Sequence, residues 1–228
     1  MSTPIYIGTY GWDDPAWAAR FYPDELPADW RFCFYSNRLR SVIVPGATGA
    51  EADARTLAQW VEDSDPEFGF VVELPPALAR PVPAPAPQIA AFIERLAPLA
   101  AQVRGMLVPL DNAHGIDSAW LAQLVSALEP FPVCVDPASS WRCADVRDVL
   151  VRHRVGECWY PARDPEPVPG GRLLVVRTEA ATPREQRRIL EQTHAWQGDH
   201  GLAGVFFDGR EAPTRAEQAR VVAELMGI

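Results

Sequence analysis

The sequence predicts a single α/β barrel of the TIM type over residues 1–228, with eight parallel strands joined by helices. Three observations predict this fold. Eight short apolar runs recur along the chain, helical patterns lie between most of them, and the chain has 228 residues, close to the ~250 typical of such barrels. Alternating strands and helices indicate parallel strands with crossover helices, and eight repeats are the number that closes a barrel.

The eight apolar runs are the predicted strands. Each is rich in Val, Ile or aromatic residues, and its continuous apolar character is typical of a parallel strand buried on both faces. The runs begin near Ile5, Ser41, Gly69, Gly105, Pro132, Glu157, Arg172 and Gly204. A doubly wound open sheet is the competing fold, but the segment 8–12 lacks the glycine-rich phosphate turn expected after its first strand.

Apolar residues spaced three and four apart predict four of the intervening helices. The four stripes are Ile89, Phe92, Ile93, Leu96 and Val103; Leu121, Leu124, Val125 and Leu128; Val146, Val149 and Leu150; and Val221, Val222, Leu225 and Met226. Two capping boxes, Thr182 with Glu185 and Thr214 with Glu217, predict where the last two helices begin. These patterns place a helix after most of the strands.

Two proline-rich stretches interrupt the pattern. The segment 161–171, between the sixth and seventh strands, carries four prolines, and proline removes backbone donors and fixes φ. We therefore expect the crossover helix there to be missing or reduced. The segment 75–87 is predicted to be a stiff, extended connector, in preference to a proline-rich docking motif.

The formal net charge is −9, and all 21 basic residues are arginines scattered along the chain. A nucleic-acid binder needs a basic stripe that displaces counterions from phosphates. The charge therefore disfavours nucleic acid and anionic membranes as partners and leaves a small-molecule ligand as the favoured class. The sequence leaves the oligomeric state open.

The cysteines and the hydropathy of the chain indicate in which cellular compartment the protein is expected. Cys33, Cys134, Cys143 and Cys158 form no Cys-x-x-Cys pair, and no histidine pair has zinc-ligand spacing. The first residues lack the charged-then-apolar pattern of a signal peptide, and no apolar run reaches the ~18 residues of a membrane span. We expect a cytoplasmic protein with reduced cysteines.

The opening of the chain resembles that of a known family. Ile7-Gly8-Thr9-Tyr10-Gly11-Trp12 is followed by Trp17, Phe21-Tyr22-Pro23, Leu26-Pro27 and Trp30. These uncommon residues, in this order and at similar spacing, resemble the YecE-like family, also called domain of unknown function 72. The resemblance thins but continues along the whole chain. It implies a TIM-like barrel and no established activity.

The chain departs from the family's pattern at most polar positions. Arg177, Trp12 and Trp141 match. Different residues stand where the family carries polar ones: Val42-Ile43-Val44-Pro45, Glu73, Pro109, Val135-Asp136-Pro137-Ala138-Ser139, Thr178-Glu179 and Asp208-Gly209-Arg210. The resemblance therefore implies a divergent member that has lost or rebuilt the family's usual pocket.

In barrels of this type the functional site lies at the C-terminal ends of the strands and in the loops that follow them. We take Glu73, Asp136 and Asp208 as the candidate acid/base residues. The candidate ligand-binding residues are Arg177, Trp12, Trp141, His114, Tyr160 and Glu179. Converging carboxylates with a histidine can also hold a hard divalent ion, although the pattern does not single out a metal and no other cofactor is indicated.

Each candidate also has a structural interpretation. We expect Arg177 to lie inside the barrel and to pair with Glu73 or Asp136, either as a structural ion pair or as a clamp for an anionic ligand. Asp111, Asp117 and Asp208 are typical capping or turn residues. Tryptophans of the first long loop are expected to pack over the barrel, with stacking on a ligand as the alternative.

Two functions follow as hypotheses. The first is a barrel that binds a small polar or anionic molecule, with weak or absent catalysis. The alternative is a hydrolase or lyase acting on a sugar-like or phosphorylated compound, with Glu73, Asp136 or Asp208 as acid/base and Arg177 binding the anion. A nucleic-acid enzyme is disfavoured by the charge and by the scarcity of histidines at the expected site. The fold alone cannot decide between the two.

Overall fold

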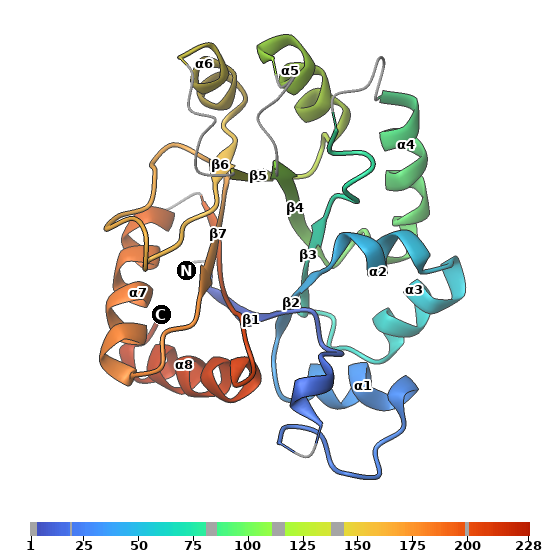
Figure 1. Ribbon diagram of the computed structural model, residues 1–228, viewed down its shortest axis with the longest axis vertical. Helices are drawn as coiled ribbons and strands as arrows, with labels where there is room; N and C mark the ends of the chain where they lie inside the picture. The colour runs from blue at the N-terminus through green and yellow to red at the C-terminus, as the bar shows by residue number, and fades with distance from the viewer. Residues whose placement is uncertain (1–3, 19, 81–85, 111–116, 138–143, 199–200) are drawn as a thin grey trace.

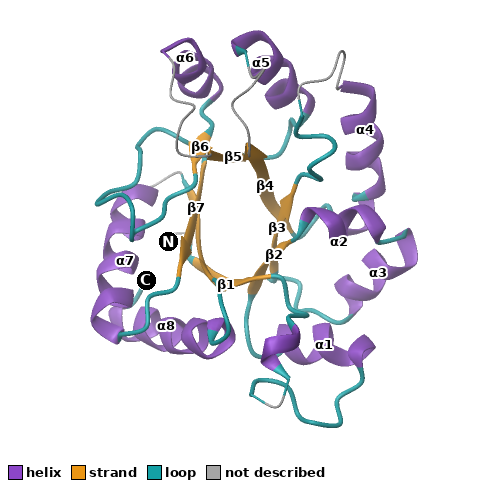
Figure 2. Cartoon of the chain, in the orientation of Figure 1, coloured by secondary structure: helices purple, strands orange, loops and turns teal. Residues whose placement is uncertain are grey.

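The computed structural model describes residues 4–18, 20–80, 86–110, 117–137, 144–198 and 201–228. Eight parallel strands form one sheet in the order β6-β5-β4-β3-β2-β1-β8-β7. The sheet curls into a nearly closed ring with helices on its outside (Figures 1 and 2). The predicted single-domain TIM-type barrel is therefore confirmed.

All eight predicted strands form. They are β1 (Tyr6–Tyr10), β2 (Ser41–Val44), β3 (Gly69–Glu73), β4 (Val103–Leu110), β5 (Val133–Pro137), β6 (Gly156–Glu157), β7 (Leu173–Thr178) and β8 (Leu202–Phe207). The α-helices are α1 (Arg31–Ser36), α2 (Gly46–Glu51), α3 (Ala54–Glu62), α4 (Ala86–Arg95), α5 (Ser118–Ala127), α6 (Ala144–His153), α7 (Pro183–Gln197) and α8 (Ala212–Met226). Three short 3₁₀ helices are η1 (Pro15–Trp17), η2 (Ala28–Trp30) and η3 (Ala97–Leu99).

The strands bury different side chains on their two faces. One apolar cluster joins outward-facing strand residues, such as Val72 and Val176, to residues of the surrounding helices. A second cluster contains no helix residue and fills the inside of the barrel: Ile43, Val71, Leu107, Cys134, Cys158, Leu173, Val175 and Phe206. Because strand side chains alternate between faces, the residue two positions after each of these also points inward.

The ring is completed between β6 and β7. The backbone amide of Trp159 donates to the carbonyl of Val175 at 2.9 Å, and the amide of Arg177 donates to the carbonyl of Trp159 at 3.0 Å. Residues 158–172, all of which are described, contain no helix, so the predicted loss of this crossover helix is confirmed.

The helix predictions are confirmed in part. Thr182 caps α7 with the predicted capping box, in which Glu185 bonds back to the Thr182 backbone. The second predicted box is wrong, because α8 begins at Ala212 and Thr214 already lies inside it. Val103, assigned above to a helical stripe, is the first residue of β4.

The buried face of α8 also differs from the prediction. Val221 and Leu225 are 48% and 84% exposed, whereas Ala212, Ala216 and Ala219 are completely buried. These small residues let α8 lie close against the neighbouring strands, so the helix buries methyl groups rather than its largest apolar side chains. The pattern of large apolar residues therefore identified the helix, and it was right for Val222 and Met226, which pack against the core, and wrong for Val221 and Leu225.

None of the helices among the described residues is both long and apolar enough to span a membrane.

The closure of the barrel generates a stability prediction. A Cβ atom at Gly156 would overlap the backbone carbonyl oxygen of Leu173, so Gly156→Ala forces β6 and β7 apart. We expect a loss of about 3 kcal/mol or more in the free energy of unfolding, measured by urea denaturation. Gly49→Ala in α2 is the matched control, since its Cβ would meet Val44 Cγ1 at an ordinary 3.7 Å. Equal stability of the two variants would contradict this account of closure.

Candidate functional site

Six polar side chains gather at the barrel mouth, the end of the ring formed by the C-terminal ends of the strands. They are Tyr10, Glu73, Asp136, Tyr160, Arg177 and Asp208. Five of these lie two residues beyond an inward-facing apolar residue, such as Val71 before Glu73 and Val175 before Arg177. Alternation along each strand therefore places the whole set above the apolar interior of the barrel.

Arg177 is the centre of this cluster. Its Nε and Nη2 donate to the two carboxylate oxygens of Asp208 at 3.1 and 2.8 Å, a bidentate pair. Its Nη1 lies 3.5 Å from Oδ2 of Asp136. The three side chains are mostly buried, with exposed fractions of 16–22%. The guanidinium thus directs all three of its nitrogens at carboxylates from β5 and the end of β8.

Two tyrosines lie beside the guanidinium, and their hydroxyl groups donate hydrogen bonds to carboxylates of the cluster. The Cζ atom of Arg177 is 4.5 Å from the ring centre of Tyr10 and 5.9 Å from that of Tyr160. The Tyr160 hydroxyl donates to Asp136 Oδ2 at 2.6 Å, and the Tyr10 hydroxyl donates to Glu73 Oε2 at 2.7 Å. The cluster therefore consists of two phenol–carboxylate pairs and one arginine that pairs with two carboxylates.

Glu73 has partners other than the one expected. Its Oε2 accepts from the Tyr10 hydroxyl and, at 2.8 Å, from the backbone amide of Gly46 at the start of α2. No ion pair joins Glu73 to Arg177 among the described residues. The predicted pairing of Arg177 with Glu73 or Asp136 is therefore confirmed through Asp136, while Glu73 bonds to the Tyr10 phenol and the Gly46 amide instead. Asp208, expected to be a cap or turn residue, is instead the main partner of Arg177.

The surroundings raise the pKa of three of these groups, Tyr10, Tyr160 and Arg177. Burial, followed by the hydrogen bond to Glu73, raises the pKa of Tyr10. Burial, the nearby Cys158 and the bond to Asp136 raise the pKa of Tyr160. Burial would lower the pKa of Arg177, but the hydrogen bonds and charge of Asp208 outweigh it, so that pKa is raised. At neutral pH both phenols stay protonated and donate, and the guanidinium stays charged.

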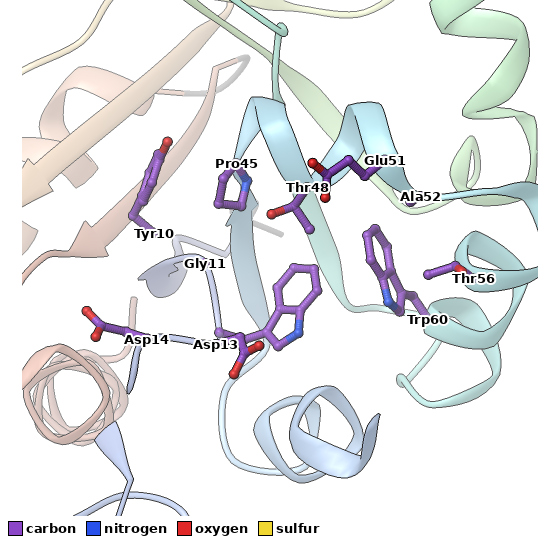
Figure 3. A pocket seen from close by; sticks show the side chains of 11 residues that line it. Tyr10, Gly11, Asp13, Asp14, Pro45, Thr48, Glu51, Ala52, Thr56 and Trp60 are labelled. Carbon is purple, nitrogen blue, oxygen red and sulfur yellow. The ribbon is translucent and has the colours of Figure 1, made fainter. Parts of the chain in front are cut away.

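A pocket of about 630 Å³ opens beside the cluster, and Tyr10 belongs to both. Figure 3 shows Tyr10, Asp13 and Asp14 on one side of this side pocket and Thr48, Glu51 and Trp60 on the other. The side pocket thus joins the loop after β1 to the segment that follows β2. Its lining combines tryptophan rings with carboxylates and two threonine side chains.

The tryptophans behave as the packing interpretation predicts. Trp12 is 8% exposed and meets the rings of Phe32 and Trp60 edge-on at 5.0 and 4.8 Å. Trp17 is buried and its indole nitrogen donates to the carbonyl of Gly209 at 3.1 Å. Trp12 still contributes to the wall of the side pocket, so packing and a role in the pocket coexist.

The other predicted site residues fall outside the cluster. Glu179 is exposed, and its carboxylate lies near Gly209. Asp117 caps α5, as expected, by accepting from the Trp120 amide. His114 and Trp141 lie outside the described residues. Among the residues that are described, no group of three His, Cys, Asp or Glu side chains is placed to hold a metal ion.

Sequence reasoning missed Tyr10, Thr48 and Trp60. Tyr10 could have been found, because it lies two residues beyond Gly8 on the inward face of β1 and stands at the C-terminal end of the strand. Thr48 and Trp60 lie on helices, and no strand periodicity indicates that these helices border the mouth.

An eight-stranded parallel barrel with polar side chains at the C-terminal ends of its strands is a TIM-barrel protein. Within that class the chain belongs to the family described as protein of unknown function DUF72, whose model matches residues 6–228. The resemblance inferred from the opening motif is confirmed. No curated protein matches the chain.

Solved structures of the same family share the fold. A DUF72 family protein of Thermotoga maritima has a TM-score of 0.77 and 18% identity, over 96% of this chain and 99% of that one. One from Enterococcus faecalis has a TM-score of 0.72 and 15% identity, over 99% and 96%. D-psicose 3-epimerase of Clostridium cellulolyticum, solved with D-tagatose, has a TM-score of 0.60 and 10% identity, over 97% and 99%. At these identities the likeness concerns the fold.

Removing the central cation should destabilise the barrel. Arg177→Met leaves the carboxylates of Asp208 and Asp136 mostly buried without their counter-charge, which we expect to cost about 2–4 kcal/mol in urea unfolding. Arg187→Met removes an arginine from the exposed pair with Glu191 on α7, and we expect it to cost less than ~0.5 kcal/mol. Similar costs for the two variants would contradict a structural role for the Arg177 cluster.

The tyrosines should ionise only when the protein unfolds. All five have a raised pKa: Tyr6, Tyr10, Tyr22, Tyr35 and Tyr160. A raised folded-state pKa contributes stability that is present below about pH 10, where free tyrosine titrates, and is lost as the pH rises further. We expect tyrosinate absorbance and loss of circular dichroism to appear together above that pH. Gradual ionisation centred near pH 10 in a folded protein would contradict this.

Proposed function

We propose that the protein binds a small, neutral, polyhydroxylated molecule at the barrel mouth and in the side pocket. The observation that carries the proposal is the excess of acceptors. Oε1 of Glu73 and Oδ1 of Asp136 accept no hydrogen bond from the described residues. Hydroxyl groups of a ligand are the donors that such oxygens take.

The charges favour a neutral ligand over an anionic one. Each of the three nitrogens of Arg177 faces a carboxylate of Asp208 or Asp136, so an incoming anion would have to compete with these carboxylates for the guanidinium. Two carboxylates share this single cation and Glu73 lies in the same cluster, while the side pocket adds Asp14 and Glu51 besides Asp13, which is paired with Arg31. An anion would enter a negative field, whereas a polyol supplies donors and carries no charge.

The side pocket has the size and lining of a small-molecule site. Its volume of about 630 Å³ lies within the range of ~300–1,000 Å³ typical of ligand pockets. Trp60 and Trp12 present aromatic surface, against which the C–H groups of a sugar ring can pack, while the Thr48 hydroxyl and Glu51 supply polar contacts. Apolar and polar surfaces in one pocket are the combination that a polyol requires.

A second candidate is catalysis on the same ligand. In each phenol–carboxylate pair, Tyr10 with Glu73 and Tyr160 with Asp136, a proton donor stands beside a potential base. Such pairs are the elements of general acid–base chemistry on a hydroxyl or carbonyl compound. This observation favours the alternative of a hydrolase or lyase strongly enough to include product detection in every binding experiment.

The binding proposal is tested by thermal unfolding in the presence of neutral sugars, sugar acids and aliphatic polyols. D-tagatose and D-psicose are suitable first probes, since a barrel of similar fold is a D-psicose 3-epimerase solved with D-tagatose. A ligand at ~100 times its dissociation constant should add about 2.7 kcal/mol of stability. We expect neutral sugars to raise the melting temperature and sugar acids to leave it unchanged.

Two variants, one in the side pocket and one remote from it, test where the sugar binds. Thr48→Val removes one hydroxyl at constant shape and should weaken sugar binding by roughly three- to tenfold. Glu62→Gln, exposed on α3 and remote from the side pocket lining, should leave binding unchanged. Stabilisation by sugar acids but not by neutral sugars, or equal binding by Thr48→Val, would overturn the proposal. Turnover that disappears in Glu73→Gln would establish the second candidate.

A further inference from the structure

A second pocket lies between the loops that follow the last two strands. Its volume is about 240 Å³, and its lining has the opposite charge to that of the barrel mouth. The residues around it are Arg20, Phe21, Ala181, Arg210, Glu211, Pro213, Thr214, Arg215 and Gln218. They come from the loop after β1, the residue before the cap of α7, and the start of α8.

Two of the three arginines have no partner that would neutralise them. Arg215 pairs with Glu211 at 3.0 Å and donates to the Glu179 carbonyl at 2.7 Å. The side chains of Arg20 and Arg210 form no ion pair or hydrogen bond with the rest of the described chain. In a protein with a net charge of −9, two uncompensated arginines facing one cavity mark a locally positive site.

The remaining polar groups of this arginine pocket are mainly donors. The Thr214 hydroxyl has no partner among the described residues, and Gln218 uses its Oε1 to accept from Gln186, which leaves its amide N–H groups for the pocket. The one carboxylate, Glu211, is held by Arg215. A cavity lined by guanidinium, hydroxyl and amide donors fits an anion with several acceptor oxygens.

We propose that the arginine pocket binds a phosphate group, either free or as a phosphomonoester of a small molecule. Phosphate presents several charged oxygens, which suits the planar donors of Arg20 and Arg210. The loops after the seventh and eighth strands are also where barrels of this type frequently bind phosphate. The proposal goes beyond the sugar site, and each can hold without the other, because the two pockets share no residue.

The arginine pocket and the barrel mouth are linked by one loop, the segment that follows β8. Arg210 lies two residues after Asp208, which binds Arg177, and the intervening carbonyl of Gly209 accepts from Trp17. The loop that carries Arg210 is therefore anchored both to the Arg177 cluster, through Asp208, and to the loop after β1, through Trp17. A phosphate bound by Arg210 would contact this anchored segment rather than the carboxylates of the mouth.

The test is isothermal titration calorimetry at constant ionic strength, in a buffer free of phosphate, with inorganic phosphate, glucose 6-phosphate and glucose as separate probes. We expect both phosphates to bind the wild-type protein and to bind more weakly as salt is raised. Tighter binding of glucose 6-phosphate identifies a phosphomonoester as the ligand, and equal binding identifies the phosphate group alone.

Variants assign the binding to the pocket. Arg20→Gln and Arg210→Gln change exposed side chains, and each should weaken phosphate binding by about tenfold, with a larger loss in the double variant. Arg187→Gln, which removes the same charge from the outer face of α7, should have no effect. Thr48→Val should weaken sugar binding alone, so failure of the sugar site and failure of this proposal can be told apart.

Two results would overturn the proposal. One is phosphate binding in the double variant that equals that of the wild type, which would show an adventitious association elsewhere on the protein. The other is wild-type protein that binds neither phosphate nor glucose 6-phosphate. In that second case, retention of a single-stranded oligonucleotide would indicate that the arginines serve a nucleic-acid surface instead.

Discussion

The structure of the barrel mouth depends on the charge of Arg177 being shared between Asp208 and Asp136. A guanidinium placed above the apolar interior of a barrel is costly unless it is paired. Here it reaches carboxylates from two other strand ends, and the rings of Tyr10 and Tyr160 lie close to it. The pairing fixes Asp208 and Asp136 in place, and the phenols in turn orient the oxygens of Glu73 and Asp136.

This arrangement separates the surface at the strand ends into two regions of opposite character. The mouth and side pocket hold carboxylates and tryptophans around an arginine whose nitrogens are already engaged. The arginine pocket beside α8 holds Arg20 and Arg210 without partners among the described residues. Acceptors therefore face one cavity and donors face the other. A neutral polyol suits the first and a phosphate group the second, which gives each region its own ligand chemistry.

Much of this follows from the sequence, for identifiable reasons. Continuous apolar runs located all eight strands, and their C-terminal ends located Glu73, Asp136, Tyr160, Arg177 and Asp208. The partner of Glu73 could not be predicted, because the stagger of neighbouring strands decides which side chains meet across a barrel. The buried face of α8 escaped prediction because close helix–strand contact selects small residues such as Ala216 over Leu225. The resemblance to the family predicted a pocket that was lost or rebuilt, and it did not indicate which side chains would meet there.

The central claim, that Arg177 and Asp208 act as one unit, is tested most directly by a double-mutant cycle of Arg177→Met and Asp208→Asn. The free energies of unfolding of the two single variants and the double variant are compared with that of the wild type. A coupling energy of about 2 kcal/mol or more is expected for a mostly buried, bidentate pair. Additive effects, with a coupling energy near zero, would contradict the account and leave the two side chains as independent neighbours.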